Sequence, residues 1–254
     1  MRRIALGVTV AAVLSVGVPG VRAQDKPDRI ARVEFIKAKP GMEAQLEAAG
    51  KKHLGWHRKQ GDTWTIHLWQ VITGDNAGSY YLGTFGHSWK DFDAREAFDA
   101  ADEQDAMAVV GPYLLSDTPS LWRVVEDASR PDPMAKGPTK FVQLTHYFVK
   151  PAKLSAFTDA IKEIKTTLDG ANFPVHTDWY ALASGGQGPH FIAATDRGSW
   201  AEFAGPEKSM SKVLDEKLGA RRATELIDAI RDAITSTYSE ALLYRPDLSY
   251  LPSK

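Results

Sequence analysis

Cysteine is absent from this sequence of 254 residues, which excludes disulfide bonds, thiol catalysis and thiolate metal sites. The sequence also has no excess of charge of either sign, because 31 Lys and Arg residues are balanced by 32 Asp and Glu residues. With a net charge of −1, the protein does not have the broad positive potential of a nonspecific nucleic-acid binder, so we expect no nucleic-acid partner. With 43% hydrophobic residues, the chain has the composition of a globular protein that folds by packing alone.

A long uncharged apolar run lies at the N-terminus, where residues 4–19 follow Arg2 and Arg3. Residues 21–23 then offer small side chains at the positions that a signal peptidase reads. The run is shorter than the hydrocarbon core of a bilayer requires. We therefore expect residues 1–23 to be a cleaved signal peptide of a periplasmic or secreted bacterial protein, with no stable membrane insertion after cleavage.

The body of the chain carries an internal repeat. A shift of 111 positions aligns residues 69–93 with residues 180–204 without a gap, and the same shift aligns Lys39-Pro40 with Lys150-Pro151. The aligned identities are Gly74 with Gly185, Thr84 with Thr195, Ser88 with Ser199, Trp89 with Trp200, and Phe92 with Phe203. One shift shared by distant segments predicts a duplication. We expect a first repeat over residues 30–128, a linker over 129–139 and a second repeat over 140–247.

Each repeat has the same expected order of elements. Period-two alternation predicts strands at 32–38, 63–72, 79–85 and 121–126, and again at 141–149, 175–183, 190–196 and 238–244. Apolar spacings of three and four predict a helix after each Lys-Pro pair, and further helices at about 95–110 and 207–235 with Ser88 and Ser199 as N-caps. This order is the ferredoxin-like βαββαβ arrangement. We predict an α+β fold in which two such repeats pack their antiparallel sheets into one intramolecular barrel with the helices outside.

The element order, the repeated Ser-Trp helix start and the Lys-Pro entry resemble the dimeric α+β barrel superfamily, which includes antibiotic-biosynthesis monooxygenases and NIPSNAP-like proteins. The resemblance covers nearly all of residues 30–247. It implies a barrel that bears a pocket, but it does not choose a reaction, because the superfamily holds cofactor-free oxygenases, haem-handling proteins, isomerases and members without known activity.

Strand alternation sorts the side chains between the helices and the barrel interior. The apolar set on each strand suits the helices, so we expect the mixed set to face the interior. The expected interior residues are Glu34, Ile36, His67, Trp69, Thr145, Tyr147, His176, Asp178 and Tyr180. Such a partly apolar lumen with a few convergent polar groups is typical of a small-molecule site. We expect Glu34, Trp69, Tyr147 and Tyr180 to contact the ligand.

Three of these residues are candidate catalytic groups. His176 and Asp178 lie on one strand face, where an imidazole and a carboxylate can act as base and orienter. His67 could act with Glu34 if the first two strands bring them together. The alternative for both pairs is a purely structural role, in which the polar groups satisfy each other.

The histidines offer a weaker case for a metal or haem. His53 and His57 have the i, i+4 spacing of zinc sites, but Leu54 stands where a catalytic Glu would follow, and Lys51, Lys52 and Arg58 would repel a cation. We expect an ordinary helix surface there, with no metal and no cofactor. His146 is expected to face the helices as a satisfied core histidine, and haem ligation by any histidine ranks third among the hypotheses.

Two functional hypotheses remain open. The first is an exported barrel that binds a small apolar or aromatic ligand, either as a simple binding protein or as a cofactor-independent oxygenase. The alternative is an interaction or structural protein with a packed barrel, which uses the apolar stripe Leu226, Ile227, Ile230 and Ile234 as a partner face or forms a homo-oligomer.

Overall fold

A computed structural model describes residues 29–252, so the expected signal peptide lies outside the described residues. The first half contains β1 (Ile30–Ala38), α1 (Glu43–Gln60), β2 (His67–Val71), β3 (Tyr80–His87), α2 (Trp89–Val109) and β4 (Leu114–Val124). The second half contains β5 (Phe141–Val149), α3 (Leu154–Gly170), β6 (Thr177–Ser184), β7 (His190–Arg197), α4 (Met210–Leu218), α5 (Ala220–Ala233) and β8 (Ile234–Tyr244). Within residues 29–252, no helix combines the length and apolar character that crossing a membrane requires.

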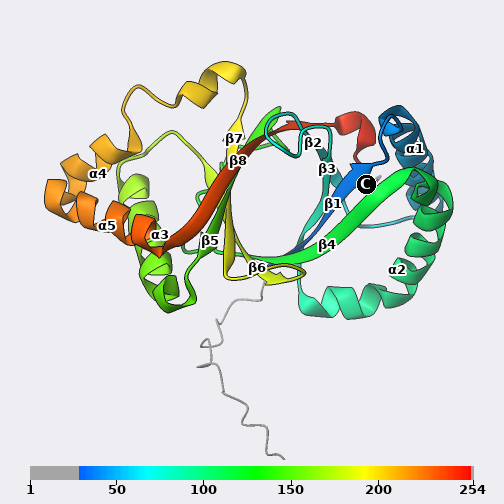
Figure 1. Ribbon diagram of the computed structural model, residues 1–254, viewed down its shortest axis with the longest axis horizontal. Coiled ribbons are helices and arrows are strands. Elements are labelled where there is room, and N and C mark those ends of the chain that lie inside the picture. Colours follow the sequence, from blue (N-terminus) through cyan, green and yellow to red (C-terminus); the bar gives the residue numbers. More distant parts are fainter. Residues whose placement is uncertain (1–28, 253–254) are drawn as a thin grey trace, which may run out of the picture.

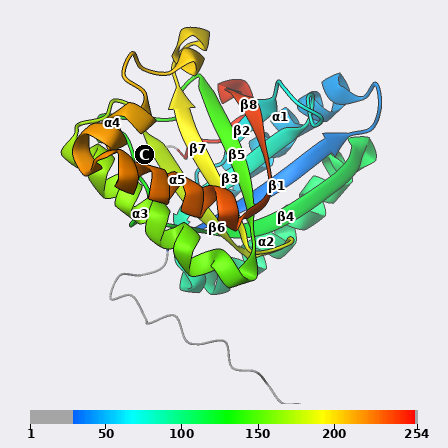
Figure 2. The same ribbon diagram turned by 60° about the vertical axis from the view of Figure 1, so that its left-hand side comes forward.

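The eight strands form a closed ring in the order β1-β3-β2-β8-β5-β7-β6-β4, and every pairing is antiparallel. The first four strands make one sheet and the last four make another, and the pairs β2–β8 and β4–β6 join the two sheets at their edges. Helices α1 and α2 lie on one side of the ring, whereas α3, α4 and α5 lie on the opposite side (Figures 1 and 2). The α+β class and the eight antiparallel strands are therefore as the sequence predicts.

The strand register follows the 111-residue shift. Val33 pairs with Gly83, and Leu144, 111 positions later, pairs with Ala194. The ends of α1 and α3 also correspond, because Gly61 and Asn172 both have positive φ, at 65° and 49°. In each case the next residue donates its amide to the carbonyl of a residue in the last helical turn. The shift therefore joins like elements in the two halves.

Element boundaries differ from the sequence prediction at several places, and β4 and β8 begin at Leu114 and Ile234, before the expected 121 and 238. The strand expected at residues 63–72 begins only at His67, because the amide of Trp64 donates to Asp62 Oδ1 and holds that segment in a turn. Ser88 caps α2 in a capping box with Asp91, but Ser199 precedes only the short 3₁₀ segment Trp200–Ala204. The long helix expected at 207–235 is divided at Gly219 into α4 and α5.

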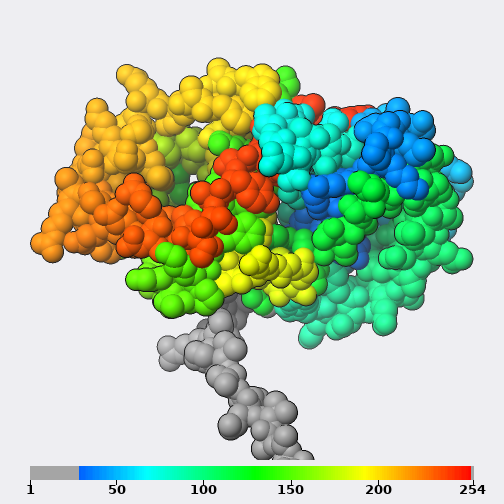
Figure 3. Space-filling view, in the orientation of Figure 1, coloured from blue at the N-terminus to red at the C-terminus, as the bar shows by residue number. Residues whose placement is uncertain are grey.

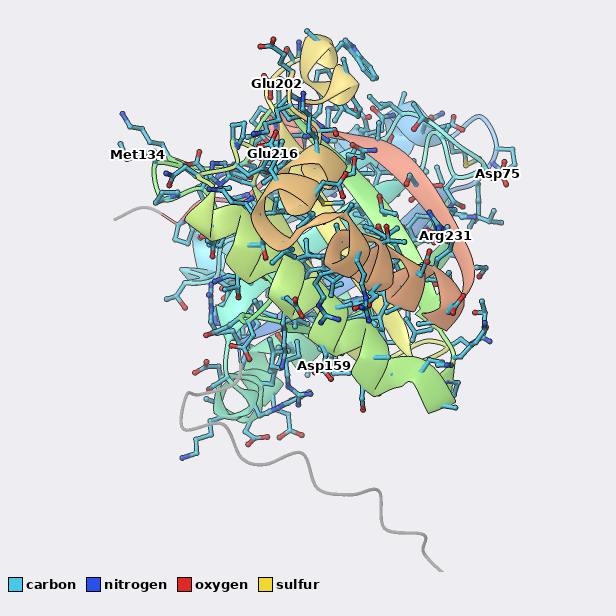
Figure 4. All side chains as sticks on the ribbon, turned by 90° about the vertical axis from the view of Figure 1, so that its left-hand side faces the viewer. Asp75, Met134, Asp159, Glu202, Glu216 and Arg231 are labelled. Carbon is cyan, nitrogen blue, oxygen red and sulfur yellow. The ribbon has the colours of Figure 1, made fainter. Side chains whose placement is uncertain are left out.

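The second sheet is covered by a continuous apolar core. Phe157 on α3 is fully buried against Phe191, and Leu214 on α4 is fully buried beside Leu226 on α5. Figure 4 shows these three helices across the outer face, where the labelled Asp159, Glu216 and Arg231 are exposed. The expectation that Leu226 belongs to a partner face is wrong, because that face of α5 packs on α3 and α4.

Two glycines at corresponding positions of the halves allow a test of how closely the β6–β7 turn approaches β4. Gly74 and Gly185 occupy corresponding turns with φ of 82° and 91°, so alanine costs roughly 1–2 kcal/mol of backbone strain at each. Only at Gly185 would the added Cβ also collide with β4, at 2.6 Å from the carbonyl oxygen of Pro119 and 2.8 Å from Ser120 Cα. We expect Gly185→Ala to lower the free energy of unfolding by at least about 1 kcal/mol more than Gly74→Ala in urea denaturation. Equal losses would contradict the close approach of the β6–β7 turn to β4.

Candidate functional site

A cavity of about 210 Å³ lies between the outer face of the first sheet and helices α1 and α2. We call it the helix-side cavity. In Figure 3 it belongs to the blue-to-green part of the molecule, which occupies the side opposite the orange α4 and α5. Its apolar lining includes Ile36, Leu46, Leu54, Ile66, Leu68, Leu82 and Val110, and its polar lining includes Arg32, Glu34, His53, His57, Arg95, Asp102 and Asp117.

Side chains of β1 alternate in the sense opposite to the sequence prediction. Glu34 and Ile36 line the helix-side cavity, whereas Val33 and Phe35 pack inside the ring of strands. The prediction for Glu34 and Ile36 is therefore wrong. The physical reason is that the ring interior, which both sheets enclose, takes up the more apolar side chains of β1.

The same inversion occurs on β5. Tyr147 lies on the outer face against Phe157 and Trp179, beneath α3, so its predicted interior position is wrong. Thr145 shares that face and hydrogen-bonds Ser239 of the neighbouring strand. His146 instead points into the ring, where its Nδ1 lies 3.0 Å from Nε2 of His190, so the expectation that it faces the helices is also wrong.

His67, Trp69 and Tyr180 lie on the inner face, as the sequence predicts. His67 Nδ1 is 3.2 Å from the hydroxyl of Tyr244, and its ring contacts Trp69. Trp69 and Tyr180 pack with an apolar cluster that combines residues of both sheets. Burial lowers the pKa of His67 and raises that of Tyr180. His67 and Glu34 thus lie on opposite faces of one sheet and do not meet.

His176 and Asp178 remain near each other at one end of the second sheet. Burial raises the pKa of Asp178, with a further contribution from Asp196, and His176 partly opposes it. Within residues 29–252, however, neither a hydrogen bond nor an ion pair joins His176 to Asp178. The structure therefore does not assemble the base and orienter in contact.

The ring interior contains a buried polar cluster around Glu240. Glu240 is 2% exposed and accepts hydrogen bonds from Asn76 and Tyr81. Burial lowers the pKa of His146 to about 3 and that of His190 to about 4, so both imidazoles are neutral. Apolar side chains from both sheets surround this cluster, as expected for a core that holds the two halves together.

Glu34 is the titratable group whose environment best suits proton transfer in the helix-side cavity. Burial raises its pKa from 4.5 to about 7, with a further contribution from Asp117, while Arg32 opposes the rise. The side chain is 26% exposed, and Arg32 Nε lies 4.0 Å from its Oε1. A carboxyl group that titrates near neutral pH inside a partly apolar cavity is typical of a functional site.

Asp62, Arg95 and His57 form a buried polar cluster at the border of the cavity, which we call the polar seam. Asp62 is fully buried and receives two hydrogen bonds of 2.7 Å from the guanidinium of Arg95. Burial opposes ionisation of Asp62, but the hydrogen bonds from Arg95 and the Trp64 amide outweigh it and lower its pKa. Its Oδ2 also contacts Nδ1 of His57 at 2.8 Å. The turn after α1 makes this contact possible, because Gly61 reverses the chain and the Asp62 amide bonds the His57 carbonyl.

The two helices bring a second carboxylate to the histidines. Residues His53 and His57 on α1 face Asp102 and Asp105 on α2, and the i, i+4 and i, i+3 spacings put each pair on one helix face. The Nε2 atoms of the two histidines and Oδ1 of Asp102 form a triangle with sides of 3.0, 3.2 and 3.3 Å. The expectation of an ordinary helix surface is wrong, because His57 is 2% exposed.

The corresponding positions of the second half are apolar. A shift of 111 converts His53, His57 and Asp62 to Ile164, Leu168 and Phe173, which are all buried in the core beneath α4 and α5. The same backbone is therefore compatible with an apolar core. Buried charges stabilise a fold less readily than apolar residues of similar volume, so stability alone does not account for the polar seam of the first half.

No protein-family model matches the chain, and no curated protein matches it. Solved structures do match its fold. A putative monooxygenase from Fusobacterium nucleatum subsp. nucleatum has a TM-score of 0.56 and 14% identity, covering 86% of this chain and 93% of that one. An anthrone oxidase-like protein has a TM-score of 0.53 and 13% identity over 87% and 92% of the two chains.

A mutant chlorite dismutase from Candidatus Nitrospira defluvii has a TM-score of 0.53 and 9% identity, over 86% of this chain and 92% of that one. These identities establish the fold and nothing finer. The resemblance to the dimeric α+β barrel superfamily holds at the level of the fold, which this chain shares with these solved structures.

Proposed function

We propose that this protein is an oxygenase-like enzyme that binds a small apolar or aromatic molecule in the helix-side cavity, with Glu34 as the group that accepts its proton. The observation that carries the proposal is the position of Glu34, a carboxyl group with a pKa of about 7, in a cavity lined by aliphatic side chains. The proposal keeps the small-molecule function expected from the sequence. It places the ligand beneath α1 and α2 instead of in the ring interior.

The volume of the cavity supports a ligand with one aromatic ring. An engineered apolar cavity of roughly 150 Å³ takes up benzene, and this one measures about 210 Å³. Ile36, Ile66 and Leu82 line its sheet side and offer an apolar contact surface for a flat ring. The polar groups at its border would orient the substituents of such a ligand.

Proton transfer at Glu34 gives the cavity a chemical role. In its ionised form Glu34 takes a proton from an acidic C–H or O–H bond of the ligand, which leaves a ligand anion and a neutral carboxylic acid. In the oxygenase reaction that we propose, dioxygen is the oxidant: a CH₂ group becomes a carbonyl group, and the second oxygen atom leaves as water. A pKa near the working pH suits this exchange, because the carboxylate is available and the neutral acid can give the proton back.

The difference between the halves favours an enzyme over a purely structural protein. We propose that the chain arose by duplication of a ferredoxin-like unit, with repeats at 30–128 and 140–247 and a linker at 129–139. In this account the second repeat kept an apolar core beneath its helices, while the first kept a cavity and a polar seam. A packed scaffold would gain nothing from the polar seam.

We also propose that the protein is exported and that cleavage follows Ala23. The support is the sequence pattern of residues 1–23 alone. Fractionation of expressing bacteria, followed by mass spectrometry of the intact protein, should find a chain that begins at Gln24 in the periplasm or the medium. A full-length chain retained in the cytoplasm would contradict export.

Binding and turnover test the proposed site directly. We expect monocyclic aromatic and quinone-like compounds to raise the melting temperature, and the productive ones to consume dioxygen at an oxygen electrode. The Glu34→Gln variant should keep the thermal shift but lose at least about 100-fold in kcat, since a general base contributes roughly that factor or more. The exposed Glu96→Gln variant is the charge-matched control.

Two results would contradict this assignment. One is a panel in which no compound changes the melting temperature. The other is loss of oxygen uptake in His67→Gln with full retention in Glu34→Gln, which would return the site to the ring interior.

The raised pKa of Glu34 also predicts a pH dependence of stability. Between pH 4.5 and about 7 the folded protein holds a proton on Glu34 that the unfolded chain has lost, so the stability contributed by this group falls as pH rises through that window. Relative to wild type, Glu34→Gln should therefore be more stable at pH 8 than at pH 5, by about 1–3 kcal/mol. Urea denaturation at both pH values measures this difference. A difference that does not change with pH would contradict the raised pKa of Glu34.

A further inference from the structure

We propose that His53, His57 and Asp102 bind one divalent first-row transition metal ion at the border of the helix-side cavity, through the two Nε2 atoms and Oδ1. These three residues lie at the contact between α1 and α2 and all line the cavity. The inference goes beyond the proposed function and does not depend on it, because metal binding stands on the geometry of these residues alone.

The spacing of the three atoms fits a shared ion. Zinc lies about 2.0–2.1 Å from its nitrogen and oxygen ligands, so ideal tetrahedral ligands are about 3.3 Å apart and octahedral neighbours about 3.0 Å apart. The triangle formed here has sides of 3.0 Å from His53 to Asp102, 3.2 Å between the histidines and 3.3 Å from His57 to Asp102. All three sides therefore fall at the separations that one coordinated ion imposes.

The other ring nitrogens are held as metal ligands require. Nδ1 of His53 lies 2.7 Å from Asp105, and Nδ1 of His57 lies 2.8 Å from Asp62. A carboxylate at this position takes the Nδ1–H hydrogen bond, fixes the tautomer and leaves the Nε2 lone pair free. Both imidazoles thus present Nε2, rather than Nδ1, to the triangle of ligand atoms, and Arg95 compensates the charge of Asp62.

Hydrogen bonding between neutral histidines and Asp102 does not satisfy this arrangement. Oδ1 of Asp102 is a buried atom with no hydrogen-bond partner among the described residues, although two ring nitrogens approach it. A proton on one Nε2 can be donated to only one acceptor, so the two remaining lone pairs would still face each other. Polar atoms that are buried without a hydrogen-bond partner lower the stability of the fold. A bound cation would be the partner of both Nε2 atoms and of Asp102 Oδ1.

The surroundings allow a cation despite the basic residues on α1. Lys52 and Arg58 are exposed on another face of the helix, and the ammonium group of Lys51 pairs with Asp247 at 2.9 Å. Trp56 and Phe98 pack against His57 on the apolar side of the cluster. Asp105 adds a further negative charge next to His53. The argument that basic neighbours repel a metal therefore fails in the folded chain.

Three protein ligands leave coordination positions free on the cavity side. Structural zinc sites are closed by four protein ligands, whereas catalytic sites keep a position for water or substrate. Two imidazoles and one carboxylate also form the ligand set that suits iron(II) and zinc. This ligand set would therefore leave at least one coordination position of the ion without a protein ligand.

Cobalt(II) is the probe for the test, because its visible absorption reports nitrogen and oxygen coordination. The purified chain, stripped with a chelator, is titrated with Co²⁺ and with Zn²⁺ by calorimetry and visible spectroscopy. We expect one ion per chain, a visible band for Co²⁺ and a higher melting temperature. His53→Gln and Asp102→Asn should each weaken binding at least about 100-fold, and Asp105→Asn about 10-fold.

Matched variants separate the proposed site from adventitious binding. His176→Gln and Glu96→Gln remove a histidine and an acidic residue outside the cluster and should leave the affinity unchanged. Asp102→Asn keeps the shape of the side chain, and circular dichroism of each metal-free variant verifies its fold. Absence of binding to the wild-type chain would overturn the proposal, as would an affinity that Asp102→Asn and His53→Gln leave unchanged. None of these measurements uses a substrate, so they are independent of the oxygenase assignment.

Discussion

The buried ion pair between Asp62 and Arg95 is the constraint on which the first half of the molecule depends. Two charges without access to water remain stable only when their hydrogen bonds are complete. Arg95 therefore has to reach Asp62 from α2, and this fixes α2 against the end of α1. The same contact orients His57 through Asp62, and both Arg95 and His57 line the helix-side cavity.

The two halves show that one backbone can carry two different interiors. Their strand register and helix ends correspond over a shift of 111 residues, yet His57 becomes Leu168 and Asp62 becomes Phe173. In the second half the helices pack on the sheet through apolar side chains. In the first half, Leu46 and Leu54 of α1 still pack on the sheet, but polar groups lie between α1 and α2 and a cavity remains. Under the proposed function, the second half supplies stability and the first half supplies the site.

Much of the fold could be predicted from the sequence, because alternation and helical spacing are local properties. The Ser88 cap, the strands of the second half and the inner position of Trp69 follow from such patterns. Which face of β1 lies inside the ring could not be predicted. The residues around Val33 and Glu34 do not indicate which side of the strand the second sheet encloses. The cluster on α1 and α2 was missed because Asp102 lies 45 residues after His57 in the sequence. The spacing of His53 and His57, together with Gly61 and Asp62, was the only local signal for it.

The location of the bound molecule decides between this account and a site inside the ring. Methyl-resolved NMR of isoleucine-labelled protein, titrated with a monocyclic aromatic compound, measures it directly. If the helix-side cavity is the site, the δ1-methyl signals of Ile36 and Ile66 shift while that of Ile192, inside the ring, stays in place. A shift of the Ile192 signal without change at Ile36 and Ile66 would contradict the account.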